Sequence, residues 1–438
     1  MSSRLSWGRY PPLPQAARPV AWRQHTVAAL RETGAGTART LPFGNGRSYG
    51  DSCYAESGQV LHMAHLDRFI EVDWQSGRIK AEAGVLLADV LDVAVPNGWF
   101  LSVTPGTKYV TLGGAVANDV HGKNHHVRGT FGRHVLTFGL IRSDANAELV
   151  CSPTQNNALF TATIGGLGLT GIITWVELQL MPIASPAIDV ASFKFGSLAE
   201  FFTLSAKLDP LHEYGVAWVD CLATGAHAGR GIYMVGDHAR IGELESKPRR
   251  KLAVPFVFPV SAVNNVTLRA FNAAYYTMHK SGQQQSRTGY DPFFYPLDGI
   301  LHWNRIYGKR GFQQFQCVIP ERQAEPAIEA LLAAIARSGS GSFLAVLKRC
   351  GNIVSPGKMS FPMAGTSLAL DFPNHPRLDR LFDKLDRIVS DAGGRLYPAK
   401  DAHMHGDDFR RAYPNWHEVE ALRDPLLCSQ FWKRVTQS

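Results

Sequence analysis

Short apolar runs separated by glycine and turn residues dominate the first hundred residues of the chain. Residues 41–84 contain the runs "QVLHMAHL", "FIEVDW" and "RIKAEAG", the last two separated by Gln75, Ser76 and Gly77. This pattern predicts strands joined by tight turns. The next segment, "LLADVLDVAVPNG", places apolar residues at helical spacing and stops at Pro96 and Gly98, so it predicts one helix. Strands mixed with single helices indicate an α+β arrangement in layers.

From residue 186 to residue 394 the pattern changes to longer strand-like runs with two amphipathic helices. The strand-like runs are "GVAWVDCLA", "RGIYMVGD", "FQQFQCVIP", "SFLAVLKRC" and "GTSLALDFP"; the helices are "AEPAIEALLAAIARSG" and "HPRLDRLFDKLDRIVSDAGG". Apolar residues of the second helix recur every three or four positions, at Leu378, Leu381, Phe382, Leu385 and Ile388. The 438 residues exceed the roughly 250–300 of a single core. We therefore predict a second, inserted domain at 186–394, built on an antiparallel sheet.

Three glycine clusters interrupt this pattern: "GNGRSYGD" at 44–51, "PGTKYVTLGGAVA" at 105–117 and "IGGLGLTGII" at 164–173. The third contains G-x-G-x-x-G at Gly166, Gly168 and Gly171, but a helix-like segment precedes it and a strand-like one follows. A Rossmann site requires the reverse order, because the helix after the glycines holds the pyrophosphate with its N-terminus. Glycine loops can instead bind phosphate oxygens with a concave array of N–H groups. Each cluster alone is more typical of a tight turn, whereas three together suit one long ligand with a pyrophosphate.

The composition limits the class of binding partner but does not identify one. Apolar residues make up 45% and charged residues 19% of the chain, which is typical of globular proteins. The net charge of +8 suits an anionic partner, but the cations are spread without an aromatic-basic motif, which argues against nucleic acid. The six cysteines lack C-x-x-C and zinc spacing, which favours free thiols in a reducing compartment. His125 and His126 lack accompanying ligands, so we expect no metal.

The stretch "KPRRKLAVPFVFPVSAVNN" at 247–265 places four cations before a proline-broken apolar run. One interpretation is a solvated basic turn before a buried strand. The other is a loop, 247–260, that touches lipid head groups with its cations and a lipid chain with Phe256, Val257 and Phe258. The chain start lacks the apolar core of a signal peptide, and no run approaches 20 apolar residues. We expect a cytoplasmic protein, and under the second interpretation a peripheral one at the inner membrane.

Five motifs spread over the chain occur in the order of a known family. They are "GNGRSYGD", "PGT…VTLGGAVANDVHGKNHH", "GTFGRHV", "TIGGLGLTGII" and "GGRLYPAKD". Together they resemble the FAD-linked oxidases of the vanillyl-alcohol oxidase type, and among these most the decaprenylphosphoryl-β-D-ribose oxidases, the oxidising half of a 2′-epimerase. The resemblance implies a two-domain fold in which 1–185, completed by 395–438, bind FAD and 186–394 bind the substrate. It also implies a short-chain reductase as partner.

The resemblance assigns FAD to the glycine clusters. It implies FAD contacts from Gly46, Arg47, Ser48, Tyr49, Pro105, Gly106, Thr107, Gly113, Gly114, Asn118, His121, Gly122, Ile172 and Tyr397. The glycines would approach the cofactor backbone to backbone, and polar side chains would face its ring and the substrate. In the ribose oxidases the histidine at the position of His121 lies near the flavin without a covalent bond, so we expect non-covalent FAD.

Oxidation of a secondary alcohol requires a group that accepts the hydroxyl proton next to a hydride acceptor, which FAD supplies. The resemblance points to Lys400 in "YPAKD", with Tyr49 and His121 as further catalytic residues. A buried lysine either acts as a base through a lowered pKa or stays charged and stabilises an alkoxide; the sequence leaves both open. The resemblance implies substrate contacts from Lys123, Gln314, Gln316, Lys348 and Ser367. Gln314 and Gln316 lie two apart in a strand-like run and so point to one face.

The chain departs from the mycobacterial ribose oxidases before "DFP". They carry an asparagine and, two residues later, a cysteine, where this chain has Ser367 and Ala369. The sequence therefore predicts FAD-dependent oxidation of a sugar secondary hydroxyl, with the 2′-hydroxyl of a polyprenyl-phosphate pentose as the first substrate, in the synthesis of cell-wall or envelope glycans. The alternatives are an oxidase of a soluble polyol, aldonolactone or glycoside, and a flavin- or phosphate-binding protein without turnover.

Overall fold

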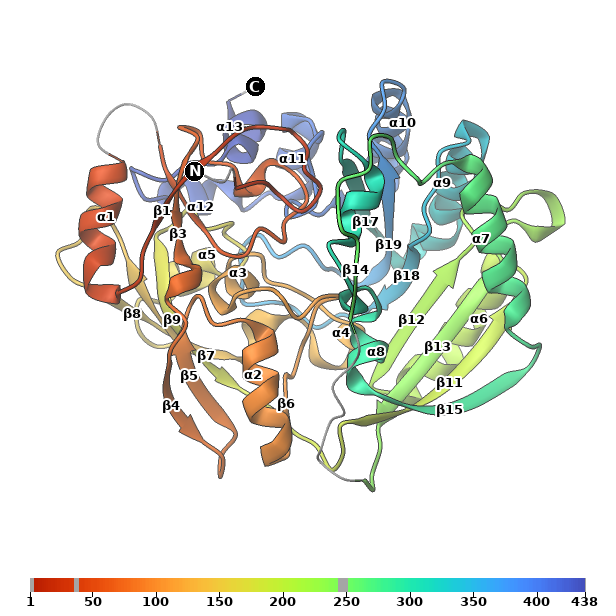
Figure 1. Ribbon diagram of the computed structural model, residues 1–438, viewed down its shortest axis with the longest axis horizontal. Coiled ribbons are helices and arrows are strands. Elements are labelled where there is room, and N and C mark those ends of the chain that lie inside the picture. The colour runs from red at the N-terminus through yellow and green to blue at the C-terminus, as the bar shows by residue number, and fades with distance from the viewer. Residues whose placement is uncertain (1–3, 35–38, 243–250, 438) are drawn as a thin grey trace.

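The computed structural model describes residues 4–34, 39–242 and 251–437, and Figure 1 shows a sheet on each side of the molecule. The first sheet has five antiparallel strands in the order β4 (Phe69–Asp73), β5 (Arg78–Glu82), β9 (Ile172–Gln179), β7 (Val135–Ile141) and β8 (Leu149–Cys151). A smaller parallel sheet contains β1 (Ala16–Pro19), β3 (Gln59–His62) and β2 (Leu41–Phe43). The strands predicted between residues 59 and 84 are confirmed.

The second sheet has eight strands, and all of its pairings are antiparallel. Their order is β15 (Gln283–Gly289), β11 (Ala187–Phe195), β13 (Gly231–His238), β12 (Tyr214–Val219), β18 (Ala345–Cys350), β19 (Gly365–Pro373), β17 (Phe312–Pro320) and β20 (Arg395–Leu396). The five strand-like runs predicted after residue 186 all lie in this sheet. The mixed helix and sheet content agrees with an α+β fold.

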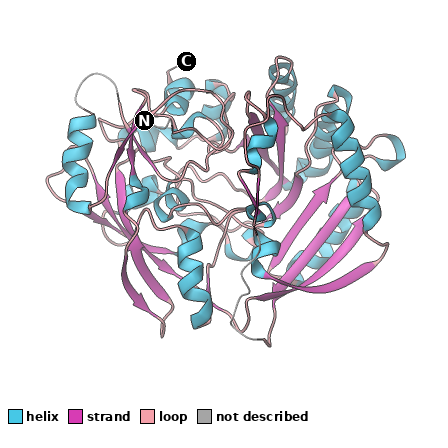
Figure 2. Ribbon diagram, in the orientation of Figure 1, coloured by secondary structure: helices cyan, strands magenta, loops and turns pink. Residues whose placement is uncertain are grey.

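Helices cover one face of the eight-stranded sheet, behind the strands in Figure 2. They are α6 (Leu198–Leu208), α9 (Ala324–Ser338) and α10 (Leu378–Asp391). Toward the other face lie α7 (Asn265–Met278) and α8 (Tyr290–Phe294). The prediction of two helices in this region was therefore incomplete. Helix α7 carries Leu268, Phe271, Tyr275 and Met278 at spacings of three and four, a helical signal that the prediction did not use.

The glycine clusters lie where helices and strands of the first half meet. The predicted helix at 86–98 is α2 (Leu87–Ala94), and the chain leaves it through Gly98 at φ 79°. Helix α5 (Asn157–Thr163) precedes the third cluster and β9 follows it, which confirms the reversed order that excludes a Rossmann site. The remaining elements of this half are α1 (Thr26–Thr33), α3 (Leu112–Ala117), α4 (His125–Arg128), β6 (Trp99–Phe100) and β10 (Met181–Pro182).

The end of the chain returns to its beginning, as the blue and red segments at the top of Figure 1 show. Its helices are α11 (Gly406–Ala412), α12 (Trp416–Ala421) and α13 (Gln430–Thr436). Leu427 forms a bridge with Thr40, and Ser429 forms one with Ala55. The C-terminal segment therefore packs against the first sixty residues, around the loop of the first glycine cluster.

The proposed lipid-contacting loop is only partly described. Three of its four cations, Lys247, Arg249 and Arg250, lie outside the described residues, and the fourth, Lys251, donates to the Tyr109 hydroxyl at 2.7 Å. In the described part, β14 (Leu252–Ala253) pairs with β16 (Ile300–Leu301), Phe256 is 61% exposed and Val260 is 77% exposed. Within the described ranges, no helix has the length and apolar character needed to cross a membrane.

Candidate active site

A cavity of about 830 Å³ takes its walls from both halves of the molecule. This volume lies in the upper part of the roughly 300–1,000 Å³ that cofactor and ligand pockets occupy. Every residue predicted for cofactor, catalysis or substrate lines it, except Ile172. The side chain of Ile172 is fully buried in a separate core with Leu30 and Leu61, whereas its neighbours Gly171 and Ile173 line the cavity.

The first glycine loop is held close to the loop that carries Lys400. Gly46 has φ 60°, a left-handed conformation that favours glycine. Gly50 leaves no room for a side chain, because a Cβ there would lie 1.5 Å from the carbonyl oxygen of Asp401. The Tyr49 N–H donates to the Ala399 carbonyl at 3.0 Å. The loop at 44–51 and the loop at 397–401 thus form one unit, although about 350 residues separate them in the sequence.

The second glycine loop is clamped by residues 290–298. The Asp298 carboxylate accepts hydrogen bonds from Thr107 Oγ1 at 2.8 Å and from the Lys108 N–H at 2.9 Å. Thr111 caps α3 and accepts the Gly114 N–H at 3.1 Å. A Cβ at Gly106 would meet no atom within 4 Å, because this residue faces the open cavity. The loop therefore presents bare backbone to whatever occupies the cavity.

Arg47 supplies a cation to the same region of the cavity. Its guanidinium lies 4.0 Å from the ring centroid of Trp7, and burial lowers its pKa. Its Nε is buried without a hydrogen-bond partner. A buried unpaired donor next to exposed backbone amides suits an anion. The glycine loops and Arg47 therefore fit the pyrophosphate of FAD.

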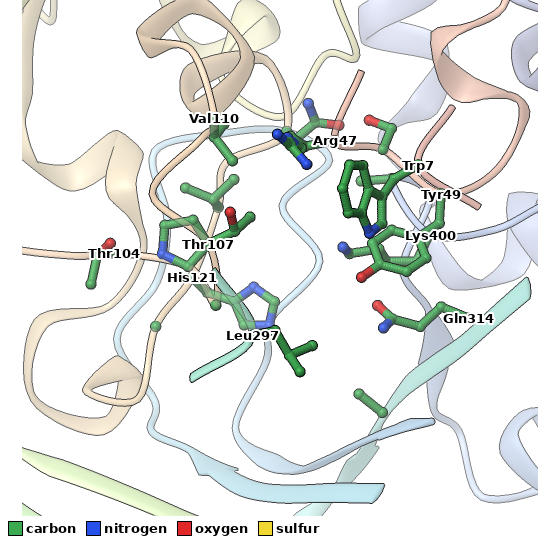
Figure 3. Close-up of a pocket in the computed structure, with 18 of the residues that line it drawn as sticks. Trp7, Arg47, Tyr49, Thr104, Thr107, Val110, His121, Leu297, Gln314 and Lys400 are labelled. Atoms are coloured by element: carbon green, nitrogen blue, oxygen red, sulfur yellow. The ribbon is translucent and has the colours of Figure 1, made fainter. Parts of the chain in front are cut away.

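The predicted catalytic side chains gather next to Trp7 and Arg47 in the same cavity. Figure 3 shows Tyr49, Lys400 and Gln314 side by side, with His121 across from them. Lys400 Nζ lies 3.7 Å from the Tyr49 ring centroid. Burial lowers the pKa of Lys400 to about 7, and the charge of Asp371 limits the shift. Burial also raises the pKa of the Tyr49 phenol well above 10, so this group stays neutral.

Asp371 is a site residue that the sequence did not single out. It is 1% exposed and accepts a hydrogen bond from Gln314 Nε2 at 2.5 Å, while its other carboxylate oxygen is buried without a partner. Burial raises its pKa to about 7, against the effects of Gln314 and Lys400. Asp371 stands opposite Gln314 in the pairing of β17 with β19, so only the strand register reveals its position. The sequence also did not single out Trp7 and Asp298, because the residues that they contact are distant in the sequence.

His121 is a neutral, positioned imidazole. Gln316 Nε2 lies 3.1 Å from His121 Nε2, and the rings of Phe361 and Tyr397 pack at 5.3 and 5.4 Å. Burial, followed by the charge of Lys348, lowers its pKa well below 6.5, so Nε2 accepts the hydrogen bond from the amide. Tyr397 donates to the Asn118 carbonyl at 2.8 Å, which ties the 397–401 loop to α3.

Two further lysines are buried at the boundary of the cavity. Lys348 Nζ donates to the Gly122 carbonyl at 2.9 Å, and Lys123 Nζ donates to the Phe293 carbonyl. Burial lowers the pKa of Lys123 to about 7 and also lowers that of Lys348. Ser367 stands opposite Lys348 in the sheet. With Arg47 and Lys400, four basic side chains line the cavity against the two carboxylates of Asp298 and Asp371, which suits an anionic ligand.

The remaining polar candidates lie outside this arrangement. His126 Nε2 bonds the His212 carbonyl at 3.0 Å, and His125 is buried with both ring nitrogens unpaired. Across the residues that the structure describes, there is no group of three or more His, Cys, Asp and Glu side chains suited to a metal. The six cysteines are free.

The fold and the cavity place the protein in a class. Residues 15–150 match the family model of the FAD binding domain, and this range contains the first two glycine clusters. The protein is an FAD-dependent oxidoreductase.

Similarity over the whole chain then identifies the family. The chain is 33% identical to decaprenylphosphoryl-β-D-ribose oxidase of Mycolicibacterium smegmatis, over 96% of this chain and 94% of that protein. It is 32% identical to an uncharacterized protein in the mprA 5′ region of Streptomyces coelicolor, over 78% of this chain and 96% of that protein. L-gulonolactone oxidase of Mus musculus is 31% identical over only 32% of this chain and 31% of its own length. The chain belongs to the FAD-linked oxidase family that includes decaprenylphosphoryl-β-D-ribose oxidase.

Proposed function

We propose that the protein oxidises a secondary hydroxyl of a lipid-linked sugar to a ketone, with the 2′-hydroxyl of a polyprenyl-phosphate pentose as substrate. The observation that carries this proposal is the cavity itself. It combines the glycine backbone and Arg47 with Lys123, Lys348 and Lys400, so that an anionic sugar derivative would bind beside the cofactor. The relative whose name specifies a lipid-linked ribose matches almost the entire chain. A separate short-chain reductase would then reduce the ketone, so that the two steps together epimerise the sugar for envelope glycan synthesis.

Lys400 is proposed as the group that accepts the hydroxyl proton. With its pKa lowered to about 7, a substantial fraction of Lys400 is neutral near pH 7, as a general base requires. Tyr49 packs its ring against Nζ and holds the lysine in place. His121, neutral and held by Gln316, orients the substrate beside them. Bound FAD supplies the hydride acceptor.

The substrate contacts follow from the same geometry. Lys123 and Lys348 are proposed to bind the phosphate, because both line the cavity beside the eight-stranded sheet: Lys348 lies on β18, and the Lys123 carbonyl accepts the Gly215 N–H of β12. Gln314, Gln316 and Ser367 are proposed to hydrogen-bond the sugar hydroxyls. Ala369 offers no thiol, so covalent capture by nitroaromatic compounds at this position should fail.

The finer assignments of the architecture are part of this proposal. Residues 1–185 and 395–438 would form the FAD domain, and 186–394 the inserted substrate domain over it. FAD would be bound without a covalent link. The exposed Phe256 and Val260 support peripheral contact of the 247–260 loop with a lipid surface.

The competing function is oxidation of a soluble polyol, aldonolactone or glycoside. Its support is the similarity to L-gulonolactone oxidase, which extends over a third of the chain. Anaerobic mixing with candidate substrates separates the two functions, because reduction bleaches the visible flavin band. We expect bleaching by a polyprenyl-phosphate pentose and not by free polyols or aldonolactones. The reverse result would establish the competing function.

A further inference from the structure

The cavity does not end at the catalytic side chains but continues across the eight-stranded sheet. Gln316 pairs with Ala369, Ala369 with Val346, and Val346 with Trp218, on four adjacent strands. All four residues line the cavity. Adjacent strands lie about 4.8 Å apart, so this row extends roughly 14 Å from the His121 partner Gln316. Along it the side chains change from an amide to a methyl group, an isopropyl group and an indole.

This far end forms an apolar arm, defined by Val216, Trp218, Met234, Val346, Phe271 and Tyr275. Val216 and Met234 are cross-strand neighbours on β12 and β13. Their strand neighbours Ala217 and Val235 point to the opposite face, into the core beneath the helices. Alternation along the strands therefore gives one face to the core and the other to the arm.

Helix α7 forms the outer wall of the arm with aromatic rings. Tyr275 lies 4.8 Å from the Trp218 ring centroid, and Phe271 lies 5.0 Å from that of Phe343. The Trp218 indole N–H already donates to the Phe343 carbonyl at 2.9 Å, so the indole has no donor left for a ligand. Phe271 remains 44% exposed although it lines the cavity. The walls around Trp218 thus offer apolar contact, and serine and threonine hydroxyls enter the lining beyond Met234, at its partner Ser192 on β11 and at Ser286 and Thr288 on β15.

The position of the arm selects its occupant. Lys348 lies on β18 two residues beyond Val346, and alternation places both side chains on the same face. An anionic group bound by Lys348 would therefore have apolar surface directly beside it. A soluble sugar would leave that surface without a partner.

We propose that the apolar arm binds the hydrocarbon chain of the substrate, next to the phosphate held by Lys348. This inference rests on the proposed lipid-linked substrate and adds the site for its chain. The occupant is the apolar chain of a phosphodiester-linked sugar, with its polar head at Lys400 and Gln316.

Alkyl phosphates test the arm without any turnover. The affinity of the FAD-loaded enzyme for butyl, hexyl and octyl phosphate is measured by calorimetry below their micelle concentrations. Full burial of a methylene contributes about 0.8 kcal/mol, roughly fourfold in affinity, so the dissociation constant should fall steadily with chain length. Equal affinity for butyl and octyl phosphate would overturn the proposal.

A matched pair of substitutions places the effect in the arm. Met234→Gln puts an amide in the arm, whereas Met278→Gln makes the same change on α7 where the side chain is 73% exposed. We expect Met234→Gln to reduce the preference for octyl over butyl phosphate at least tenfold and Met278→Gln to leave it unchanged. Equal preferences in the two variants would contradict the assignment, and circular dichroism checks that both are folded.

Different experimental outcomes would refute the apolar arm and the proposed function. Chain-length dependence without oxidation of any pentose substrate would keep the arm and refute the function. Oxidation of a pentose phosphate with equal kcat/KM for its methyl and decyl esters would keep the pentose oxidation and refute the arm.

Discussion

At the scale of single residues, the site depends on desolvated lysines and one desolvated aspartate in the cavity wall. Lys123, Lys348 and Lys400 are each half-buried in the cavity wall, and desolvation lowers the pKa of all three. A buried ammonium loses its hydration, so its neutral form becomes accessible near neutral pH. The same burial raises the pKa of Asp371. The pKa values of Lys123, Lys400 and Asp371 each lie at about 7, so these three groups can exchange a proton at physiological pH.

Replacement of Lys400 tests its role in the reaction. We expect Lys400→Ala to bind FAD normally and to lose flavin reduction by about 10²–10⁴-fold, the usual contribution of a general acid or base. Stopped-flow bleaching under anaerobic conditions measures the loss. Lys358→Ala is the control, because Lys358 is paired at the surface with Glu418. Near-normal reduction in Lys400→Ala would remove the lysine from the mechanism.

The pH dependence distinguishes the two roles left open for Lys400. If neutral Lys400 accepts the proton, the rate of flavin reduction rises with pH up to its pKa of about 7 and then levels. Below that pH the rate should fall about tenfold per unit, because the protonated amine cannot act as a base. A rate that declines above pH 7 would instead show that the charged lysine stabilises an alkoxide.

At the scale of elements, α13 clamps the two loops that carry Tyr49 and Lys400. Arg434 donates to Asp51 at 2.8 and 2.9 Å and to Asp401 at 2.8 Å. Asp401 also contacts His403, whose pKa Asp386 and Asp401 raise against the effect of burial. The clamp joins the first glycine motif, the lysine motif and the C-terminal helix, so the final residues of the chain position the catalytic end of the cavity.

Substitution of Arg434 measures how much the clamp contributes to the free energy of unfolding. Arg434→Met leaves Asp51 and Asp401 buried without their cation, and breaking such a pair costs about 3–5 kcal/mol. Urea unfolding of the purified variant gives this value. The neighbouring Lys433→Met removes only a surface pair with Glu56, which is worth about 0–1 kcal/mol. If both variants lose the same small amount, the clamp does not stabilise the fold.

At the scale of the whole molecule, the cofactor site connects segments that are far apart in the sequence. The cavity walls draw residues from four separated segments, within 41–53, 104–123, 167–173 and 397–400. A ligand that binds only the folded state stabilises it by mass action. The holoenzyme and the apoenzyme should therefore differ clearly in their unfolding midpoints.

Removal and return of FAD test this connection. FAD at a hundred times its dissociation constant should stabilise the apoprotein by about 2.7 kcal/mol, measured as a rise in the melting temperature. Because we propose non-covalent binding, acid precipitation should leave a colourless pellet and a yellow supernatant. A pellet that stays yellow would show a covalent link.

Much of the molecule was predictable because local patterns carry the information. Helix α10 and the five central strands follow from apolar periodicity, and the glycine motifs point to the cofactor loops. Helix α7 was not predicted, although Leu268, Phe271, Tyr275 and Met278 recur along it at helical spacing; the structure leaves Phe271 and Met278 of this stripe exposed. Asp371 was not singled out, because a buried aspartate in a strand looks like any other until its register with Gln314 is known. The position of the Ile172 side chain also became clear only in the structure, where it points away from the cavity and packs in a separate core.

The sequence by itself determined the five long strands of the second sheet, helices α2, α9 and α10 and the glycine-rich loops, because periodicity and turns depend on neighbours along the chain. The class of cofactor followed from the resemblance of five motifs to a known family. Only the tertiary structure decided which charged groups share one cavity, which carboxylate faces Lys400, and that an apolar arm continues from the catalytic end. These features depend on strand register and burial, and both arise from contacts between residues hundreds of positions apart.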